Sequence, residues 1–296
     1  MKFFYQKLFW LLILIGRPFG GFRPRRILYY CAHRGYDLES LKLKGMAPID
    51  TCWGGKIYGH PYYHLDRDII INGYYDESLH SLLEKKIKPN STVFDIGANI
   101  GEVSLHMAYL VGSGGRVYAF EPAPSLYLRL TDNISVNNFQ ERILVSRVAL
   151  SNKSGYQSFA VAAEDQENQG MGSLINMQND VVSHTITVQT QTLDSFVKEF
   201  GVQNIDFMKI DIQGSEYAFI EGAKNVLTTM GPDLVIEISE SDLSCAEITP
   251  KDLLELLFDI GYRIFSIDDY GIVEKEINRF TVSHKKLTNN VFCTKN

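Results

Sequence analysis

The feature that most limits the possible folds is a regular alternation of strand and helix patterns that begins near residue 91. Short apolar runs that are typical of strands occur at TVFDIG, RVYAFEP, RILVSRVAL, DFMKIDI, PDLVIEIS and RIFSID, and helical patterns stand between most of them. Successive units of this kind specify a mostly parallel sheet that is covered by helices on both faces. The predicted fold class is therefore α/β, with a doubly wound, Rossmann-like sheet.

Composition and pattern divide the chain into segments. Three are expected: an apolar and basic N-terminal segment at 1–26, an extension at 27–88, and the α/β domain at 89–296. In the extension, aromatic and polar residues alternate over 53–75, which predicts short strands or a hairpin. Residues 76–87 have helical spacing, with Asp76 as the cap. Residues 152–190 interrupt the α/β pattern with a polar insertion and one edge or antiparallel strand, TITVQTQT.

The N-terminal segment combines an apolar run with a basic cluster. The run at 3–16 contains Lys7 and is shorter than the roughly 20 residues that a membrane-spanning helix needs. Four arginines follow within 17–26, and they could meet anionic lipid head groups. A helix docked on the protein, a helix at the membrane surface and a cleaved signal peptide stay open as alternatives, although no small-x-small cleavage site follows the run.

Charge and cysteine content narrow the classes of function. The formal net charge is −6 and no long basic stripe is present, which argues against a nucleic-acid partner. Cys31, Cys52, Cys245 and Cys293 are too scattered for a zinc pattern or a redox pair, and are typical of the reduced thiols of an intracellular protein. A cytoplasmic location is predicted, with contact at the cytoplasmic face of a membrane through 1–26 as an open alternative. The oligomeric state is open.

The glycine loop in VFDIGANIG limits the choice of cofactor. A P-loop requires GxxxxGK[ST] and a dinucleotide loop requires GxGxxG, whereas here Asp95 takes the first glycine's place and Glu102 opens the helix. Both carboxylates would repel phosphate. S-adenosylmethionine has no phosphate, and its ammonium and sulfonium groups would attract Asp95. Gly97 permits close backbone approach, and Asn99 adds no charge. The loop therefore favours S-adenosylmethionine.

A family resemblance rests on several motifs together. VFDIGANIG, AFEP, RVALSNKSG, GMGSL, TLDSF, DFMKIDIQGSE and PDLVIEIS occur in this order over residues 70–295. In this combination, the chain resembles the FkbM family of S-adenosylmethionine-dependent methyltransferases. The resemblance implies a seven-stranded class I methyltransferase sheet with an antiparallel last strand, for which NNVFCTK is suited. It also implies methyl transfer, most often to a hydroxyl of a sugar or a polyketide-like acceptor.

The resemblance also implies a set of residues that bind the cofactor. These are Asp95, Gly97, Ala98, Asn99 and Gly101 in the loop, Glu121 at the ribose, Pro122 in the following turn, and Ala149 and Ser151 against the adenine. An acid after the second strand can accept hydrogen bonds from ribose hydroxyls, although NAD enzymes place one there too. Many methyltransferases carry an acid at the adenine position, where this chain has Ala-Leu-Ser, so a polar contact with adenine is left open.

Carboxylates at the sheet edge are the candidates for catalysis. Asp211 and Glu237 end two strands, and Glu216 begins the helix after the first of them. An alcohol acceptor must lose its proton, so Asp211 is the leading base or orienting group, with Glu237 and Glu216 beside it. Lys209 alternates with Asp211 along the strand and is a candidate ion-pair partner. These carboxylates could also hold Mg²⁺, but no ligand pattern requires a metal.

The acceptor is predicted to be a small molecule or a glycan. Residues 170–173 lie in the long insertion, and such loops usually act as lids or binding elements. We expect them to border the acceptor pocket, with 53–75 as the opposite wall. His60, His64 and His106 are alternative bases, although each alone is more often structural.

The predicted function is O-methylation of a sugar, glycolipid or secondary metabolite. An NAD(P)-dependent oxidoreductase and a non-catalytic, membrane-associated binding module are the alternatives.

Overall fold

The computed structural model describes residues 46–60, 62–162, 172–174, 182–268, 270–279 and 290–295. They fall into two compact units, with the boundary between Tyr75 and Asp76. The N-terminal segment, Cys31, Gly170 and Met171 lie outside the described residues. Within the described ranges, none of the helices has the length and apolar character needed to cross a bilayer.

The first unit contains a short hairpin and one helix. Its elements are β1 (Ala47–Asp50), β2 (Lys56–Gly59), which pairs antiparallel with β1, and α4 (His64–Asn72). The expectation of strands or a hairpin over 53–75 is correct for β2 and wrong for α4. Two buried charged side chains of α4 bind the backbone just before the helix, because Asp66 accepts from His60 N at 2.7 Å and Arg67 donates to Tyr62 O at 2.6 Å.

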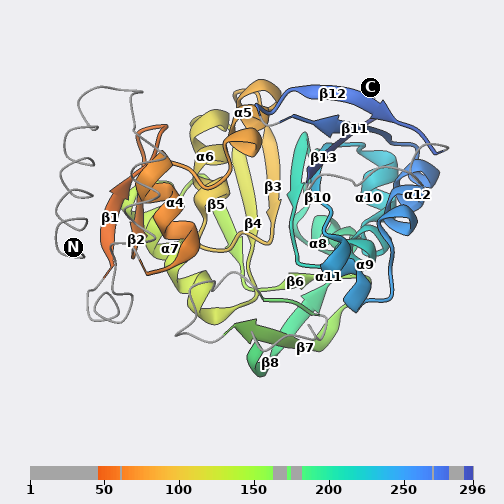
Figure 1. Ribbon diagram of the computed structural model, residues 1–296, viewed down its shortest axis with the longest axis horizontal. Coiled ribbons are helices and arrows are strands. Elements are labelled where there is room, and N and C mark those ends of the chain that lie inside the picture. Colours follow the sequence, from red (N-terminus) through yellow and green to blue (C-terminus); the bar gives the residue numbers. More distant parts are fainter. Residues whose placement is uncertain are drawn as a thin grey trace, which may run out of the picture. The chain divides into compact units, whose positions relative to one another are not determined.

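The second unit is built on one large mixed sheet (Figure 1). Its strands are β3 (Thr92–Ile96), β4 (Arg116–Phe120), β5 (Ile143–Ser146), β9 (Phe207–Ile210), β10 (Asp233–Glu237), β11 (Arg263–Ile267), β12 (Val273–Ile277) and β13 (Asn290–Thr294). They lie in the order β12-β11-β13-β10-β9-β3-β4-β5. The ladder from β5 to β10 is parallel. As predicted, β13 is antiparallel, to both β10 and β11. In the described part of the chain, β12 adds an eighth strand to the predicted seven.

Helices cover both faces of this sheet, which confirms the doubly wound α/β class (Figure 1). One face carries α5 (Glu77–Lys86), α6 (Glu102–Val111) and α7 (Pro124–Val136), and the other carries α8 (Leu193–Phe200), α9 (Glu216–Gly222), α10 (Lys224–Thr229) and α12 (Pro250–Ile260). A short helix, α11 (Glu240–Cys245), follows β10. Because β3 lies between β4 and β9, the order of the strands reverses there, and ligands of such folds bind outside the carboxyl ends of the strands at this point.

The main apolar core lies on the face of the sheet that is covered by α8, α9, α10 and α12. Phe94 on β3 and Met208 and Ile210 on β9 are fully buried in it. Since successive side chains of a strand point to opposite faces, the residues between them, Asp95 and Lys209, point to the α6 face. These two residues are direct register partners on neighbouring strands. The alternation thus places a buried aspartate and a buried lysine side by side, near the carboxyl ends of the two strands.

The insertion is attached to a small three-stranded sheet, which consists of β6 (Ala149–Leu150), β7 (Gly155–Ala162) and β8 (Val182–Gln191). As predicted for TITVQTQT, β8 is antiparallel to its long partner, β7, and it also pairs parallel with β6. The single strand predicted at RILVSRVAL is therefore divided between β5 and β6. The division arises because the chain after Ser146 leaves the large sheet to pair with β8, where Ser151 N donates to Gln191 O at 2.9 Å.

Candidate functional site

Three residues of the loop after β3 have left-handed backbone conformations. Gly97, Asn99 and Gly101 have φ values of 81°, 52° and 91°. A Cβ on Gly97 would lie 2.0 Å from the carbonyl oxygen of Asp211, and one on Gly101 would lie 2.3 Å from a methyl carbon of Leu130. Both positions therefore require glycine, for conformation and for space. The loop fits closely between the end of β9 and helix α7.

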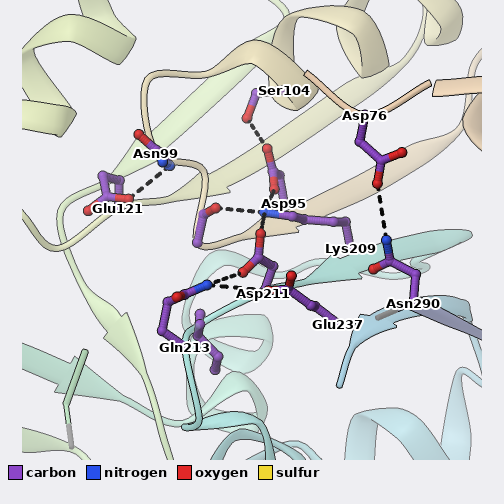
Figure 2. Close-up of polar contacts among 12 residues, drawn as sticks. Asp76, Asp95, Asn99, Ser104, Glu121, Lys209, Asp211, Gln213, Glu237 and Asn290 are labelled. Carbon is purple, nitrogen blue, oxygen red and sulfur yellow. Dashed lines mark hydrogen bonds and ion pairs between the residues drawn. The ribbon is translucent and has the colours of Figure 1, made fainter. Parts of the chain in front are cut away.

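Asp95 and Lys209 lie behind this loop (Figure 2). Asp95 is 0% exposed, and its Oδ2 accepts a hydrogen bond of 2.5 Å from Ser104 on α6. Lys209 Nζ lies 3.4 Å from Asp95 Oδ1 and 3.3 Å from Asp211 Oδ2, and it donates to Gly97 O at 2.7 Å. Burial raises the pKa of Asp95, against the opposing effect of Lys209 and Ser104. The expected pairing of Lys209 with Asp211 is confirmed, and Asp95 shares the same ammonium group.

Glu121, at the end of β4, is bound to the same loop. Its Oε2 accepts from Asn99 N and its Oε1 from Ala123 N, both at 2.8 Å. The carboxyl group is buried, and burial raises its pKa to about 7 despite these two bonds. Pro122 connects it to the first turn of α7. Each carboxylate oxygen can accept more than one hydrogen bond, so Glu121 retains acceptor capacity beside the loop (Figure 2).

The ends of β9 and β10 bring two carboxyl groups together. Gln213 Nε2 donates to Asp211 Oδ1 at 2.9 Å and to Glu237 Oε2 at 3.3 Å (Figure 2), and a hydrogen bond between the two carboxyl groups contributes to both of their pKa shifts. Burial, followed by the charge of Asp211, raises the pKa of Glu237 to about 9. Burial also acts to raise the pKa of Asp211, but Lys209 and the hydrogen bonds from Glu237 and Gln213 outweigh it and lower the value. The two pKa values are therefore shifted in opposite directions, upward for Glu237 and downward for Asp211.

Glu216, the third candidate for catalysis, turns back onto the loop that precedes α9. Its Oε1 accepts from Ile212 N at 3.0 Å and from Gly214 N at 3.2 Å. The side chain is buried, and burial raises its pKa to about 7. Its hydrogen bonds thus go to backbone amides, whereas those of Asp211 and Glu237 go to side chains. Through these bonds, Glu216 holds the loop between β9 and α9 in place.

The residues expected near the adenine, Ala149 and Ser151, are both buried. Ala149 pairs with Thr190 of β8. A Cβ on Gly222 of α9 would lie 2.0 Å from Ser151 O, so this part of the chain packs tightly against the helix. The contact with adenine stays a prediction.

The insertion reaches the site through Ser173. Its hydroxyl donates to the carbonyl oxygen of Gln213 at 2.7 Å, and its backbone pairs with Ala160 of β7. Ser173 therefore contacts the loop that carries Asp211, and its predicted place beside the acceptor is compatible with this contact. The sequence reasoning missed Gln213 itself, although an uncharged amide two residues after Asp211 was a usable signal. Gln213 has a left-handed backbone conformation, with a φ of 51°, and its side chain contacts both carboxyl groups.

The three histidines that were alternative bases are divided between the two units. His60 and His64 belong to the first unit. His106 is fully buried on α6 and stacks on His80 with ring centroids 4.4 Å apart. Burial, with the charge of His80, lowers the pKa of His106 to about 3, so this ring is neutral. Across the described residues, no group of three or more His, Cys, Asp or Glu side chains is arranged to hold a metal ion.

Comparisons with known proteins agree with this geometry. The Methyltransferase FkbM domain matches residues 95–264, more than half of the chain. The 2-O-methyltransferase NoeI of Sinorhizobium fredii is 28% identical over 187 residues, which are 60% of this chain and 74% of that protein. The hexuronic acid methyltransferase AglP of Haloferax volcanii is 26% identical over 179 residues, 60% of this chain and 65% of that protein.

A further relative is the 31-O-demethyl-FK506 methyltransferase FkbM of Streptomyces tacrolimicus, which is 25% identical over 218 residues, 66% of this chain and 81% of that protein. The matched family region begins at Asp95 and includes Glu121, Asp211 and Glu237. The loop and the buried acids therefore lie inside the matched region. The resemblance inferred from the motifs is confirmed, and the chain belongs to the FkbM family of S-adenosylmethionine-dependent methyltransferases.

Proposed function

We propose that the chain methylates a hydroxyl group of a sugar, glycolipid or secondary metabolite, with Asp211 as the general base. The observation that carries this proposal is the pair of carboxyl groups at the ends of β9 and β10, which Gln213 joins by hydrogen bonds and whose pKa values are shifted apart, downward for Asp211 and upward for Glu237. The pair lies at the edge of the sheet where doubly wound folds bind ligands. It is adjacent to the glycine loop, since Lys209 contacts both Asp211 and Gly97.

The residues around the loop fit the cofactor by their chemistry. When it is bound, S-adenosylmethionine supplies a methyl group that is activated by a sulfonium cation. The proposed binding residues are Asp95, Gly97, Ala98, Asn99, Gly101, Glu121, Pro122, Ala149 and Ser151. Buried carboxylates suit a cationic ligand and would repel phosphate. Because the carboxylate of Asp95 is buried and bound to Ser104 and Lys209, we assign it the role of holding the loop and Lys209 in place. We assign to Glu121 the hydrogen bonds with the ribose hydroxyls.

The side chains at the edge of the sheet would prepare the acceptor. Asp211 is ionised and its side chain is 35% exposed, so it can accept a proton from a bound hydroxyl group. As the hydroxyl oxygen bonds to the methyl carbon, the carbon–sulfur bond would break and S-adenosylhomocysteine would be the neutral leaving group. The hydroxyl proton passes to Asp211, whose charge is neutralised. Gln213 and Glu237 hold the Asp211 carboxylate in place by hydrogen bonds. General base catalysis of this kind contributes about 10²–10⁴-fold.

The names of the relatives support hydroxyl-bearing acceptors. NoeI is a 2-O-methyltransferase, AglP acts on a hexuronic acid, and FkbM of Streptomyces tacrolimicus methylates 31-O-demethyl-FK506. Membership of a methyltransferase family removes the oxidoreductase and binding-module alternatives.

Contact of residues 1–26 with a membrane surface is a separate proposal, and liposome partitioning that is unchanged by deletion of residues 1–20 would end it.

Two measurements test the proposed function. Titration calorimetry should detect binding of S-adenosylhomocysteine and not of NAD; binding of NAD alone would overturn the proposed cofactor. Transfer of radiolabelled methyl groups to a panel of glycosides, glycolipids and hydroxylated metabolites should identify an acceptor. With that acceptor, Asp211→Asn should lower kcat by about 10²–10⁴-fold and leave binding of S-adenosylhomocysteine intact. Full turnover by Asp211→Asn would refute the assignment of the base.

A further inference from the structure

We infer that Lys209 is a positioning residue that couples the cofactor loop to the general base, because its one ammonium group binds the Gly97 carbonyl and the carboxylates of Asp95 and Asp211. This inference rests on the proposed function, since it takes Asp211 as the base. Lys209 touches neither reaction partner in this scheme. It acts through the groups that do.

The ammonium group of Lys209 lies close to three oxygen atoms. Nζ lies 2.7 Å from Gly97 O, 3.3 Å from Asp211 Oδ2 and 3.4 Å from Asp95 Oδ1. An ammonium group has three donors, and these oxygens come from β3, the loop after it, and the end of β9. Lys209 is buried and points to the α6 face of the sheet. Figure 2 shows it between Asp95 and Asp211.

The charges around Lys209 keep it permanently protonated. The acids that act on it are Asp95 of β3, Asp211, and Glu237 of β10, and Lys209 acts in turn on Glu121 after β4. Burial alone would lower the pKa of Lys209, but the charges of Asp211 and Asp95 outweigh it and raise the value. The lysine is therefore a fixed cation within a group of buried acids, and its charge acts to lower the pKa values of Asp95 and Asp211.

Loss of the ammonium group would affect the base and the loop together. Asp211 would lose the cation that opposes its burial and would hold its proton at neutral pH. Gly97 O would lose its donor, and the loop has little room to adjust because a Cβ on Gly97 would already be 2.0 Å from Asp211 O. A residue that only filled space between the strands would produce neither effect.

The test uses the full-length protein without an acceptor. In carbon NMR of protein labelled at the aspartate carboxyl groups, the Asp211 signal is assigned by its absence from Asp211→Asn. In Lys209→Met, we expect this signal to titrate about 1–3 pH units higher than in the wild type. Affinity for S-adenosylhomocysteine should fall by about tenfold or more, as for loss of a charged hydrogen bond. Lys153→Met, at an exposed position, is the control and should change neither quantity.

Two further variants keep the test decisive. Asp95→Asn combined with Lys209→Met removes a buried acid together with its cation, which protects the fold, and it should still raise the titration of Asp211. Lys209→Arg retains the charge and should leave that titration close to the wild-type value. An unmoved Asp211 signal in folded Lys209→Met or in the double variant would overturn the inference. Turnover by Asp211→Asn tests the base independently, so the two proposals can fail separately.

Discussion

The α-carbon of Gly97 lies so close to the carbonyl group of Asp211 that an added Cβ would be 2.0 Å from its oxygen. The first residue after β3 and the first residue after β9 are thus in direct backbone contact. The backbone of the cofactor loop therefore cannot move toward β9 at Gly97 without displacing the backbone of the proposed base.

Gly97→Ala should therefore disrupt the site far more than its size suggests. The alanine would need a φ near 81° and would clash with Asp211 O. We expect a drop in Tm and loss of measurable binding of S-adenosylhomocysteine by calorimetry. Gly201→Ala is the matched control, because Gly201 also has a positive φ, 65°, with nothing within 4 Å of an added Cβ. That control should cost only about 1–2 kcal/mol. Equal effects of the two variants would contradict the close contact.

Glu121 should make cofactor affinity depend on pH. Its pKa is raised to about 7 by burial, so its carboxylate becomes fully available to hydroxyl donors only above that pH. We expect affinity for S-adenosylhomocysteine to rise between pH 6 and pH 8 about this midpoint. In Glu121→Gln the affinity should be weaker and should lack this rise, whereas Glu141→Gln, at an exposed position, should behave like the wild type. A rise that persists in Glu121→Gln would assign it to another group.

The same raised pKa has a consequence for stability, with a definite sign. Between the ordinary value of 4.5 and about 7, the folded protein holds a proton on Glu121 that the unfolded chain has lost. The free energy of unfolding should therefore decrease as pH rises through this window. Chemical denaturation of the wild type and Glu121→Gln at pH 4.5 and pH 7.5 would show it, and a smaller decrease is expected in the variant.

The buried pair of His80 and Glu102 should stabilise the protein most at low pH. His80 Nε2 lies 2.5 Å from Glu102 Oε1 at the start of α6. Burial lowers the pKa of His80, but Glu102 outweighs it and raises the value above 6.5. The stabilisation is therefore complete below 6.5 and is lost as pH rises through the folded-state pKa. Glu102→Gln should cost about 3–5 kcal/mol at pH 6, and less at pH 9.

A nearby glutamate provides the control for this pair. Glu84 lies 3.7 Å from His106 but is 59% exposed, so Glu84→Gln should change the free energy of unfolding by less than about 0.5 kcal/mol. A cost of Glu102→Gln that does not depend on pH would show that the charge of His80 is not involved.

Ser173 should link the insertion to catalysis. Its hydroxyl donates to Gln213 O, and Gln213 holds both carboxyl groups. Ser173→Ala should lower kcat with an identified acceptor by about fivefold to tenfold, which corresponds to loss of one hydrogen bond of 1 kcal/mol or slightly more, while binding of S-adenosylhomocysteine stays unchanged. Ser154→Ala, at an exposed hydroxyl, is the control. Weaker cofactor binding in Ser173→Ala would place the insertion on the cofactor side instead.

The fold could be predicted well where one pattern dominates. Strands β3, β9 and β10 are buried apolar runs with an acid near the carboxyl end or directly after it (Asp95, Asp211 and Glu237), and they were recognised for that reason. Helix α4 was not recognised, because its charged residues, Asp66 and Arg67, are buried by contacts with the preceding backbone rather than exposed. Strands β7 and β12 were missed, although the strands that they pair with, β8 and β11, were predicted. The sequence of β12, VEKEI, has three charged residues in a row and therefore no apolar run.

The candidate site was predictable in its residues and less so in their contacts. The spacing of Lys209 and Asp211 along one strand indicated that they share a face, and the structure confirms the ion pair. The inclusion of Asp95 could not be foreseen, because it depends on the register between β3 and β9. The opposite pKa shifts of Asp211 and Glu237 likewise depend on burial and distance, which a sequence does not contain.

The position of β13 has a consequence for the order in which the protein can be assembled. It lies between β10 and β11, although it follows both in the chain. During synthesis, β11 cannot join the sheet until residues 290–294 have been made, and the edge of β10 is exposed to pairing with other chains until then. The strands that carry Asp95, Asp211 and Glu237 can pair with one another earlier. A nascent chain can therefore complete the framework of the proposed site while the outer part of the sheet still depends on residues 290–294.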